Sequence, residues 1–274
     1  MKAFYCVVLI SCVLASDAAL AAPKTIPISD SLAAHADKLK VKMGSQWFGH
    51  IAKWSIGDYA VVASKLGTTH IDAGSNFLKT KSDSGSSTRF SFMMSAGPVD
   101  SVTVTAEHRF RTQSQHEFRL NKTVSVGSEA LLGEADILTA LISLNADTTV
   151  KWTLWKASTI DDRGDSLFDA YLSNGERKIL ITPVMASLPK GKHGRPTFFS
   201  QLAAQAIPPA MGYEFVEGSR SLCAVQTFGG LSKETGRMVW MHRGLDARDK
   251  LVLAAAITTI LQMETSQDGR TEPE

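Results

Sequence analysis

The densest set of side chains that could bind a ligand is a basic loop formed by Lys190, Lys192, His193 and Arg195. Two glycines lie between these residues, and a short helix is expected to follow from Thr197 to Ala206. A helix N-terminus presents free N–H groups and a partial positive charge. We therefore predict that this loop binds a carboxylate, sulfate or phosphate. The alternative is a solvated loop that its charges keep polar.

A metal site would need His, Cys and carboxylate side chains that converge in space. His108 and His116 could meet across a predicted hairpin, where Glu107 and Glu117 lie beside them. Two histidines supply half of a metal site, and a third ligand would have to come from elsewhere in the fold. The alternative is that both histidines lie near the mouth of the hairpin without a metal.

No segment carries a recognisable catalytic motif. The Gly-x-Ser-x-Gly pattern of serine hydrolases is missing, and Pro189 and Gly191 prevent Ser187-x-x-Lys190 from starting a catalytic helix. Catalytic residues therefore stay unknown, no cofactor is predicted, and the chain is interpreted as non-enzymatic. Because catalytic sets are assembled in space, an extracytoplasmic hydrolase built from non-contiguous His, Ser and carboxylate residues remains the alternative.

The N-terminus has the pattern of a secretory signal peptide. Lys2 gives a positive start, Phe4 to Leu14 is an apolar run, and Ala19-Leu20-Ala21 is a small-x-small cleavage site. Cleavage near Ala21 predicts a periplasmic or secreted protein. A lipoprotein anchored at Cys12 is the alternative.

Composition narrows the range of functions further. The net charge of +2 and the lack of a basic stripe argue against a nucleic-acid partner. Cys6 and Cys12 fall in the leader, so Cys223 would be the only cysteine of the mature chain, and a bacterial envelope protein without disulfides is favoured. No segment after the leader reaches the about 20 apolar residues of a transmembrane helix.

The elements that must position these residues are mostly strands. Alternation of apolar and polar residues from Val102 to Arg111 predicts an antiparallel strand with one wet face. Asn174-Gly175 predicts a type I′ hairpin turn, and Asp246 is expected to cap a buried apolar helix. The segment 130–145 fits a helix or a strand, and 79–87 is expected to be an exposed loop. Further strands are expected at 59–71, 88–94, 117–126, 150–156, 213–216, 221–228 and 237–242.

These elements predict an α+β fold, predominantly antiparallel, arranged as a sandwich or a strongly twisted sheet. An N-terminal arm and a short helix, Asp30 to Met43, would occupy residues 22–45. A β-rich globular domain is expected over 46–262, with a possible subdivision near residue 160, and a flexible tail over 263–274. The buried C-terminal helix would pack on the sheet.

Export and the lack of a catalytic motif together suggest a function. We expect an exported, non-enzymatic envelope or secreted module that binds a protein, a glycan or another envelope component. The partner would be an envelope or extracellular protein or glycan, and the oligomeric state is not predicted.

Overall fold

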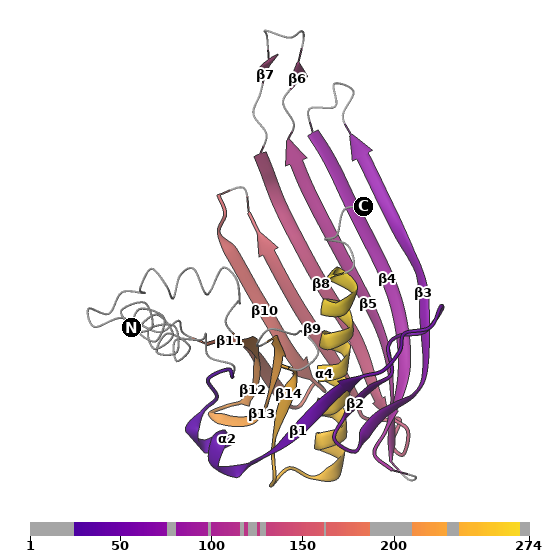
Figure 1. Ribbon diagram of the computed structural model, residues 1–274, viewed down its shortest axis with the longest axis vertical. Coiled ribbons are helices and arrows are strands. Elements are labelled where there is room, and N and C mark those ends of the chain that lie inside the picture. Colours follow the sequence, from indigo (N-terminus) through magenta and orange to yellow (C-terminus); the bar gives the residue numbers. More distant parts are fainter. Residues whose placement is uncertain are drawn as a thin grey trace, which may run out of the picture.

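The structure, a computed structural model, describes residues 25–75, 81–97, 100–115, 118–119, 125–126, 130–161, 163–186, 210–228 and 236–268. Its strands form one closed antiparallel β-barrel in the order β1-β14-β13-β12-β11-β10-β9-β8-β5-β4-β3-β2 (Figure 1). Strands β6 (Phe118–Arg119) and β7 (Ser125–Val126) form a separate two-stranded sheet.

The described residues also contain the helices α2 (Asp30–His35) and α4 (Ala247–Asp268). The barrel strands, in chain order, are β1 (Ala36–Met43), β2 (Trp54–Ile56), β3 (Tyr59–Ser75), β4 (Lys81–Ser95), β5 (Ser101–Gln115), β8 (Ala130–Leu144), β9 (Lys151–Ile160), β10 (Ser166–Ser173), β11 (Lys178–Met185), β12 (Met211–Glu217), β13 (Arg220–Phe228) and β14 (Met238–His242).

Strands β3, β4, β5 and β8 are long and form a tall, curved side of the barrel, while shorter strands complete the ring (Figure 1). Strand β5 illustrates which side chains point into the barrel and which point to solvent. Val102, Val104 and Ala106 are buried in the barrel, whereas Thr103 and Thr105 between them are exposed. Successive side chains of a strand point to opposite faces, so the barrel has an apolar interior and a polar exterior.

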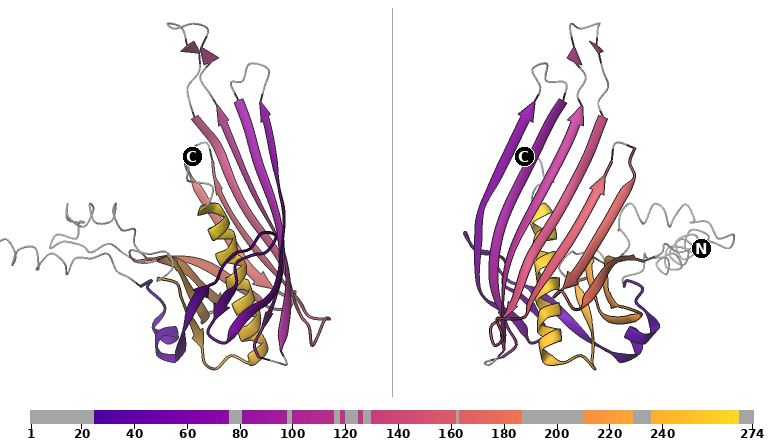
Figure 2. Two further views of the ribbon diagram at one scale, coloured as in Figure 1. Left: turned by 45° about the vertical axis from the view of Figure 1, so that its right-hand side comes forward. Right: turned by 180° about the vertical axis from the view of Figure 1, so that it is seen from behind.

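Helix α4 lies inside the curve of the barrel (Figure 2). Every residue from Leu251 to Met263 is at most 2% exposed, and the helix contacts β4, β5, β8 and β13. A helix that is apolar on all sides must be buried on all sides, and the barrel meets that need. The predicted cap is confirmed, because the backbone N–H of Asp249 donates to Asp246 Oδ1 over 2.7 Å.

The predicted sandwich or twisted sheet is wrong, because the sheet closes into a barrel around the helix. Closure depends on β1, which pairs with β14 on one side and with β2 on the other. The helix predicted from Asp30 to Met43 is wrong beyond His35, where α2 ends and the following residues are extended. Leu39 and Val41 alternate with three exposed lysines, which is the period of a strand. The mainly β composition and the C-terminal helix are as predicted.

Two further segments test predictions made from the sequence. Residues 79–87 were expected to be a loop, and residues 130–145 fitted either a helix or a strand. The expected loop over 79–87 is wrong from Lys81 onward, because β4 begins there and pairs with both β3 and β5. Neighbours on both sides satisfy the backbone N–H and C=O groups, so a segment poor in apolar side chains can still be a strand. The ambiguous segment 130–145 forms strand β8.

Three more predictions concern a hairpin at Asn174-Gly175, a strand over 117–126 and a helix from Thr197 to Ala206. The hairpin at Asn174-Gly175 is confirmed, since β10 and β11 pair around it and Gly175 has a φ of 93°. The predicted type I′ turn with Asn174 and Gly175 at its centre does not form, because the Asn174 N–H donates to the Arg177 carbonyl and leaves Gly175 and Glu176 between them. The single strand predicted over 117–126 is wrong, because β6 and β7 occupy that segment as a small hairpin. The helix predicted from Thr197 to Ala206 lies outside the described residues.

Replacing Thr258 by valine is expected to stabilise the protein by about 1 kcal/mol. Thr258 is fully buried in α4, and its Oγ1 has no hydrogen-bond partner within the described part of the chain. Valine keeps the shape and removes the buried hydroxyl. Thr259→Val is the matched control, because Thr259 Oγ1 donates to Ala255 O over 2.8 Å. Urea unfolding that finds T258V no more stable than T259V would contradict this reading.

Candidate ligand-binding pocket

Of the two histidines proposed as metal ligands, His108 lies within the described residues. His108 is 2% exposed on β5, and its Nε2 lies 2.5 Å from Asp136 Oδ1 on β8. His116 and the basic loop residues, Lys190, Lys192, His193 and Arg195, lie outside the described residues. Within the described ranges, no group of three His, Cys, Asp or Glu side chains is arranged to hold a metal ion.

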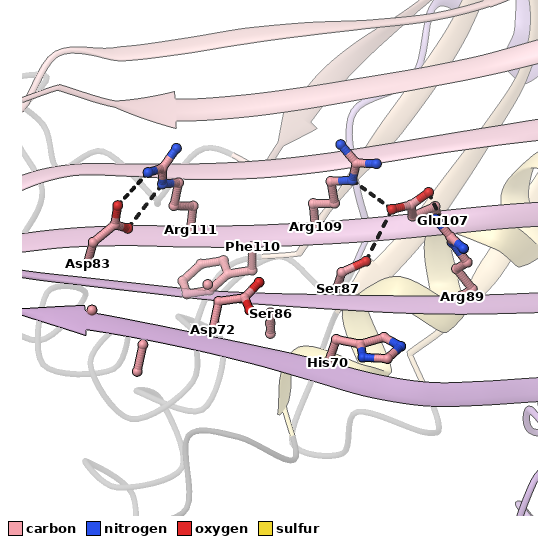
Figure 3. Close-up of a pocket in the computed structure, with 13 residues that line it drawn as sticks. His70, Asp72, Asp83, Ser86, Ser87, Arg89, Glu107, Arg109, Phe110 and Arg111 are labelled. Atoms are coloured by element: carbon pink, nitrogen blue, oxygen red, sulfur yellow. Dashed lines mark hydrogen bonds and ion pairs between the residues drawn. The ribbon is translucent and has the colours of Figure 1, made fainter.

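One cavity is an outer groove on the exposed face of β3, β4 and β5 (Figure 3). Its volume is about 760 Å³. Arg89 and Arg109 bind Glu107, and Arg111 binds Asp83, so charged side chains line much of it. The charged side chains of this groove are suited to a polar or charged ligand.

The second cavity is an inner pocket of about 620 Å³, where the upper end of α4 meets one wall of the barrel. Strands β11, β12 and β13, the residue before β14 and α4 all contribute to it. It combines apolar walls with a few polar groups, which is the pattern of small-molecule sites. Its lining residues are Pro183, Val184, Met185, Met211, Gly212, Tyr213, Thr227, Phe228, Arg237 and Glu264.

Tyr213 and Glu264 are two of the polar residues at the floor of the inner pocket. The Tyr213 hydroxyl donates to Glu264 Oε1 over 3.0 Å. Burial raises the pKa of the Glu264 carboxyl, although the Tyr213 hydrogen bond and the Lys156 charge oppose that shift. Burial and the Glu264 charge raise the pKa of Tyr213 in turn. Shifted titratable groups gathered in a pocket are typical of functional sites.

Arg237 supplies a positive charge at the same floor. It is 7% exposed, and its guanidinium lies 5.1 Å from the centre of the Trp54 ring. Its Nη2 donates to Thr265 Oγ1 and its Nε donates to the Thr227 carbonyl, each over 3.4 Å. These contacts fix the guanidinium plane between strand and helix, so the cation has a defined position at the pocket.

Three buried polar side chains, Lys156, Asp136 and His108, form a row that extends from the pocket floor into the barrel. Lys156 Nζ donates to Asp136 Oδ2 over 3.4 Å, and it lies 6.0 Å from the centre of the Tyr213 ring. Asp136 also contacts His108, so both carboxylate oxygens have partners. A buried carboxylate is tolerated only when it is bonded in this way. The row therefore extends from the pocket floor along the neighbouring strands β9, β8 and β5.

The rim of the inner pocket is apolar and open. Met185 on β11 and Met211 on β12 are directly opposite each other, and they are 60% and 43% exposed. Exposed methionines side by side form an adaptable apolar surface, because the side chain is flexible and polarisable. A ligand can therefore reach the polar floor across an apolar edge.

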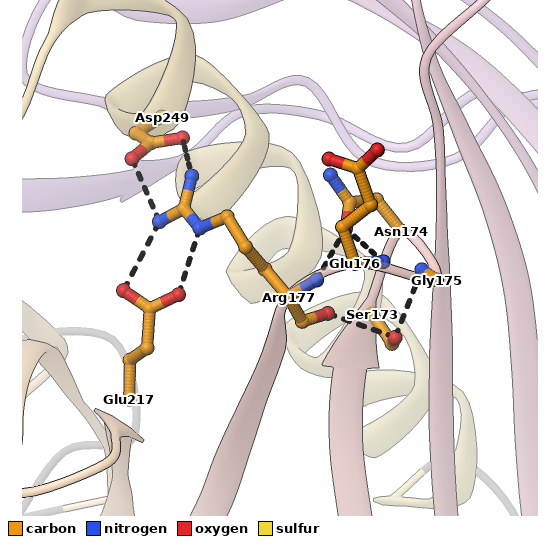
Figure 4. Close-up of polar contacts among 7 residues, drawn as sticks. All are labelled: Ser173, Asn174, Gly175, Glu176, Arg177, Glu217 and Asp249. Carbon is orange, nitrogen blue, oxygen red and sulfur yellow. Dashed lines mark hydrogen bonds and ion pairs between the residues drawn. The ribbon is translucent and has the colours of Figure 1, made fainter.

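Two contacts hold α4 in place beneath the pocket. At its N-terminal end, Arg177 binds Glu217 over 2.7 Å and Asp249 over 2.9 Å (Figure 4). Nearer the pocket, Gln262 Oε1 accepts hydrogen bonds from Trp54 Nε1 over 2.9 Å and from the Ala52 N–H over 3.3 Å. The helix is therefore tied to the barrel at both ends, and Glu264 is positioned by that attachment.

Sequence reasoning missed most of this site. Lys156 carried a usable signal, since it shares the parity of Trp152 and Leu154, which point into the barrel. Asp136 also stood out as a carboxylate in an apolar segment. Glu264 carried no such signal, because it was assigned to the expected flexible tail, whereas α4 continues to Asp268.

Comparisons with protein-family models, with curated proteins and with solved structures find no match to this chain. Within the described residues, no helix is both long enough and apolar enough to cross a membrane.

Proposed function

We propose that the protein is an exported, non-enzymatic module that binds a small amphipathic component of the envelope or its surroundings in the inner pocket. The observation that carries the proposal is the combination of an apolar methionine rim with a polar floor of Tyr213, Arg237 and Glu264. The ligand's apolar part would rest on Met185 and Met211. Its polar part would meet the floor.

The chemistry of the lining supports binding over catalysis. The residues found to line the inner pocket include no serine, cysteine or histidine. The Tyr213 hydroxyl donates to Glu264 Oε1, and the Thr227 side chain also hydrogen-bonds to this carboxyl. The lining residues therefore lack the Ser–His or Cys–His pair on which many acyl-transfer enzymes rely.

The test is a fluorescence titration with 1-anilinonaphthalene-8-sulfonate, an aromatic probe with one charged group. The wild type is expected to bind it saturably. Met211→Glu should weaken the affinity at least about tenfold, because a carboxylate in the apolar rim repels the sulfonate and resists desolvation. Leu167→Glu is the matched control, since Leu167 is 69% exposed on β10 away from the pocket. An equal loss in both variants, or no saturable binding, would refute the proposal.

Export rests on the leader pattern and has its own test. Mass spectrometry of protein recovered from cells that make the full chain should find Ala22 as the first residue. A lipid-modified Cys12 at the N-terminus would support the lipoprotein alternative. An intact Met1 terminus on cytosolic protein would exclude both routes.

A further inference from the structure

The outer groove lies where the side chains of three strands form regular rows. His70, Ser87 and Arg109 are partners across β3, β4 and β5. The next row is Asp72, Gly85 and Arg111. Gly85 adds no side chain above the sheet, so the space between the flanking charged residues stays open. The backbone thus leaves the hollow that Figure 3 shows.

The arginines of the groove and their carboxylate partners lie at different depths. The Arg89, Arg109 and Arg111 side chains are 74%, 66% and 63% exposed. Their carboxylate partners lie deeper, with Glu107 at 24% and Asp83 at 39%. A ligand that approaches from solvent therefore meets guanidinium groups before it meets these carboxylates. The three arginines supply most of the exposed charge at the groove, although Asp72 is exposed there as well and the lining holds as many carboxylates as arginines.

Glu107 orients two of the arginines. Its carboxylate accepts from Arg109 Nε over 2.7 Å, from Arg89 Nε over 3.3 Å and from Ser87 Oγ over 3.1 Å. The Arg109 hydrogen bond holds the pKa of Glu107 below its usual range, so this carboxyl stays ionised. Because both bonds use Nε, the terminal nitrogens of Arg89 and Arg109 stay outside them. Pre-oriented guanidinium groups are well suited to bind oxyanions.

We infer that the outer groove binds an acidic glycan, a polar chain on which carboxylate or sulfate groups recur. Arg109 and Arg111 are two residues apart on one face of β5, which places them about 7 Å from each other. They and Arg89 offer several cationic contacts along one line. Ser87 and His70, in the same cross-strand row as Arg109, can exchange hydrogen bonds with sugar hydroxyls.

The groove suits a glycan better than a nucleic acid. Single-stranded nucleic acids need aromatic side chains on which bases stack. Phe110 is the aromatic residue at this groove, and it points away from Arg109 and Arg111 (Figure 3). The outer groove is on the opposite face of the sheet from the inner pocket. A failed test of one proposal therefore leaves the other unaffected.

The test is calorimetric titration with a sulfated dextran fragment and a polygalacturonate fragment, with neutral dextran as the control ligand. The wild type should bind one or both acidic glycans, more weakly as salt rises, and should not bind neutral dextran. Arg89→Gln with Arg109→Gln should lower the affinity at least about tenfold. These side chains are exposed, so the melting temperature should stay within about 2 °C of the wild type.

The matched control is Arg163→Gln with Arg248→Gln, which removes the same charge from two exposed positions outside the groove. It should keep the affinity within about threefold, because exposed charges far from the ligand are screened. Equal losses in the two double variants would show general charge attraction and overturn the inference. Failure to bind either acidic glycan, or equally tight binding of a short single-stranded DNA, would also overturn it.

Discussion

Replacing Gly212 by alanine is expected to destabilise the protein by about 3 kcal/mol or more. Gly212 is buried on β12, at a point where the pairing with β13 shifts register. A Cβ there would overlap the carbonyl oxygen of Val225 and lie 2.9 Å from the Cα of Gln226. These neighbours are backbone atoms, so they cannot move aside by changing rotamer. The two strands would have to separate.

Thermal unfolding should therefore show a melting temperature lower by roughly 6–12 °C for a chain of this size. The inner pocket should lose affinity for its probe as well, because Gly212 forms part of its wall. Gly74→Ala is the matched control. A Cβ at Gly74 would have only the Asp83 carbonyl oxygen nearby, at 4.0 Å, so its stability should change little. Equal stabilities of G212A and G74A would mean that β12 and β13 do not approach as described.

Replacing Arg177 by methionine is expected to cost about 2 kcal/mol of unfolding free energy. The guanidinium joins the β10–β11 hairpin to β12 and to the start of α4, through Glu217 and Asp249 (Figure 4). It also lies 5.3 Å from the centre of the Trp152 ring. Without it, two carboxylates face each other with no cation between them. The cost stays below that of a fully buried pair, because the Arg177 side chain is 36% exposed.

The same variant should change how stability depends on pH. The hydrogen bond from Arg177 lowers the pKa of Glu217 below its ordinary value of 4.5. A lowered carboxyl pKa adds stability that is present above pH 4.5 and is lost as the pH falls through the folded-state pKa. R177M should lose part of this acid-side dependence.

Arg243→Met is the matched control for R177M. Arg243 pairs with Asp37, and both side chains are more than half exposed, at 62% and 57%. Exposed pairs contribute about 0–1 kcal/mol, so R243M should be close to the wild type. Urea unfolding at several pH values measures both effects. Similar losses in the two variants would show that the Arg177 contacts do not bind α4 to the barrel.

Local patterns predicted the elements better than their assembly. Alternation identified β5, Asn174-Gly175 identified a hairpin, and Asp246 identified the start of α4. Each of these signals lies within a few residues of chain. Closure of the barrel does not, because it needs Ala36 to meet His242 across the whole molecule. Short-range periodicity therefore could not distinguish a barrel from a twisted sheet.

The inner pocket was beyond sequence reasoning for the same reason. Tyr213 and Glu264 come from different elements and meet only because α4 lies inside the barrel. The serine-rich first half of β4, residues 81–87, was interpreted as a loop, since its pairing partners on both sides were unknown. Cys223, by contrast, lies in an apolar strand and is 0% exposed, as that pattern alone would indicate. Burial also raises the pKa of its thiol, so it is an inert core residue.

The most direct test of the binding proposal is an NMR titration of protein labelled at the methionine methyl groups. On addition of 1-anilinonaphthalene-8-sulfonate, the Met185 and Met211 resonances should shift saturably, because these side chains form the rim of the inner pocket. Met94, which is fully buried in the barrel core, should not shift. Binding that leaves Met185 and Met211 unchanged, or that perturbs Met94 as strongly, would contradict a ligand site at this pocket.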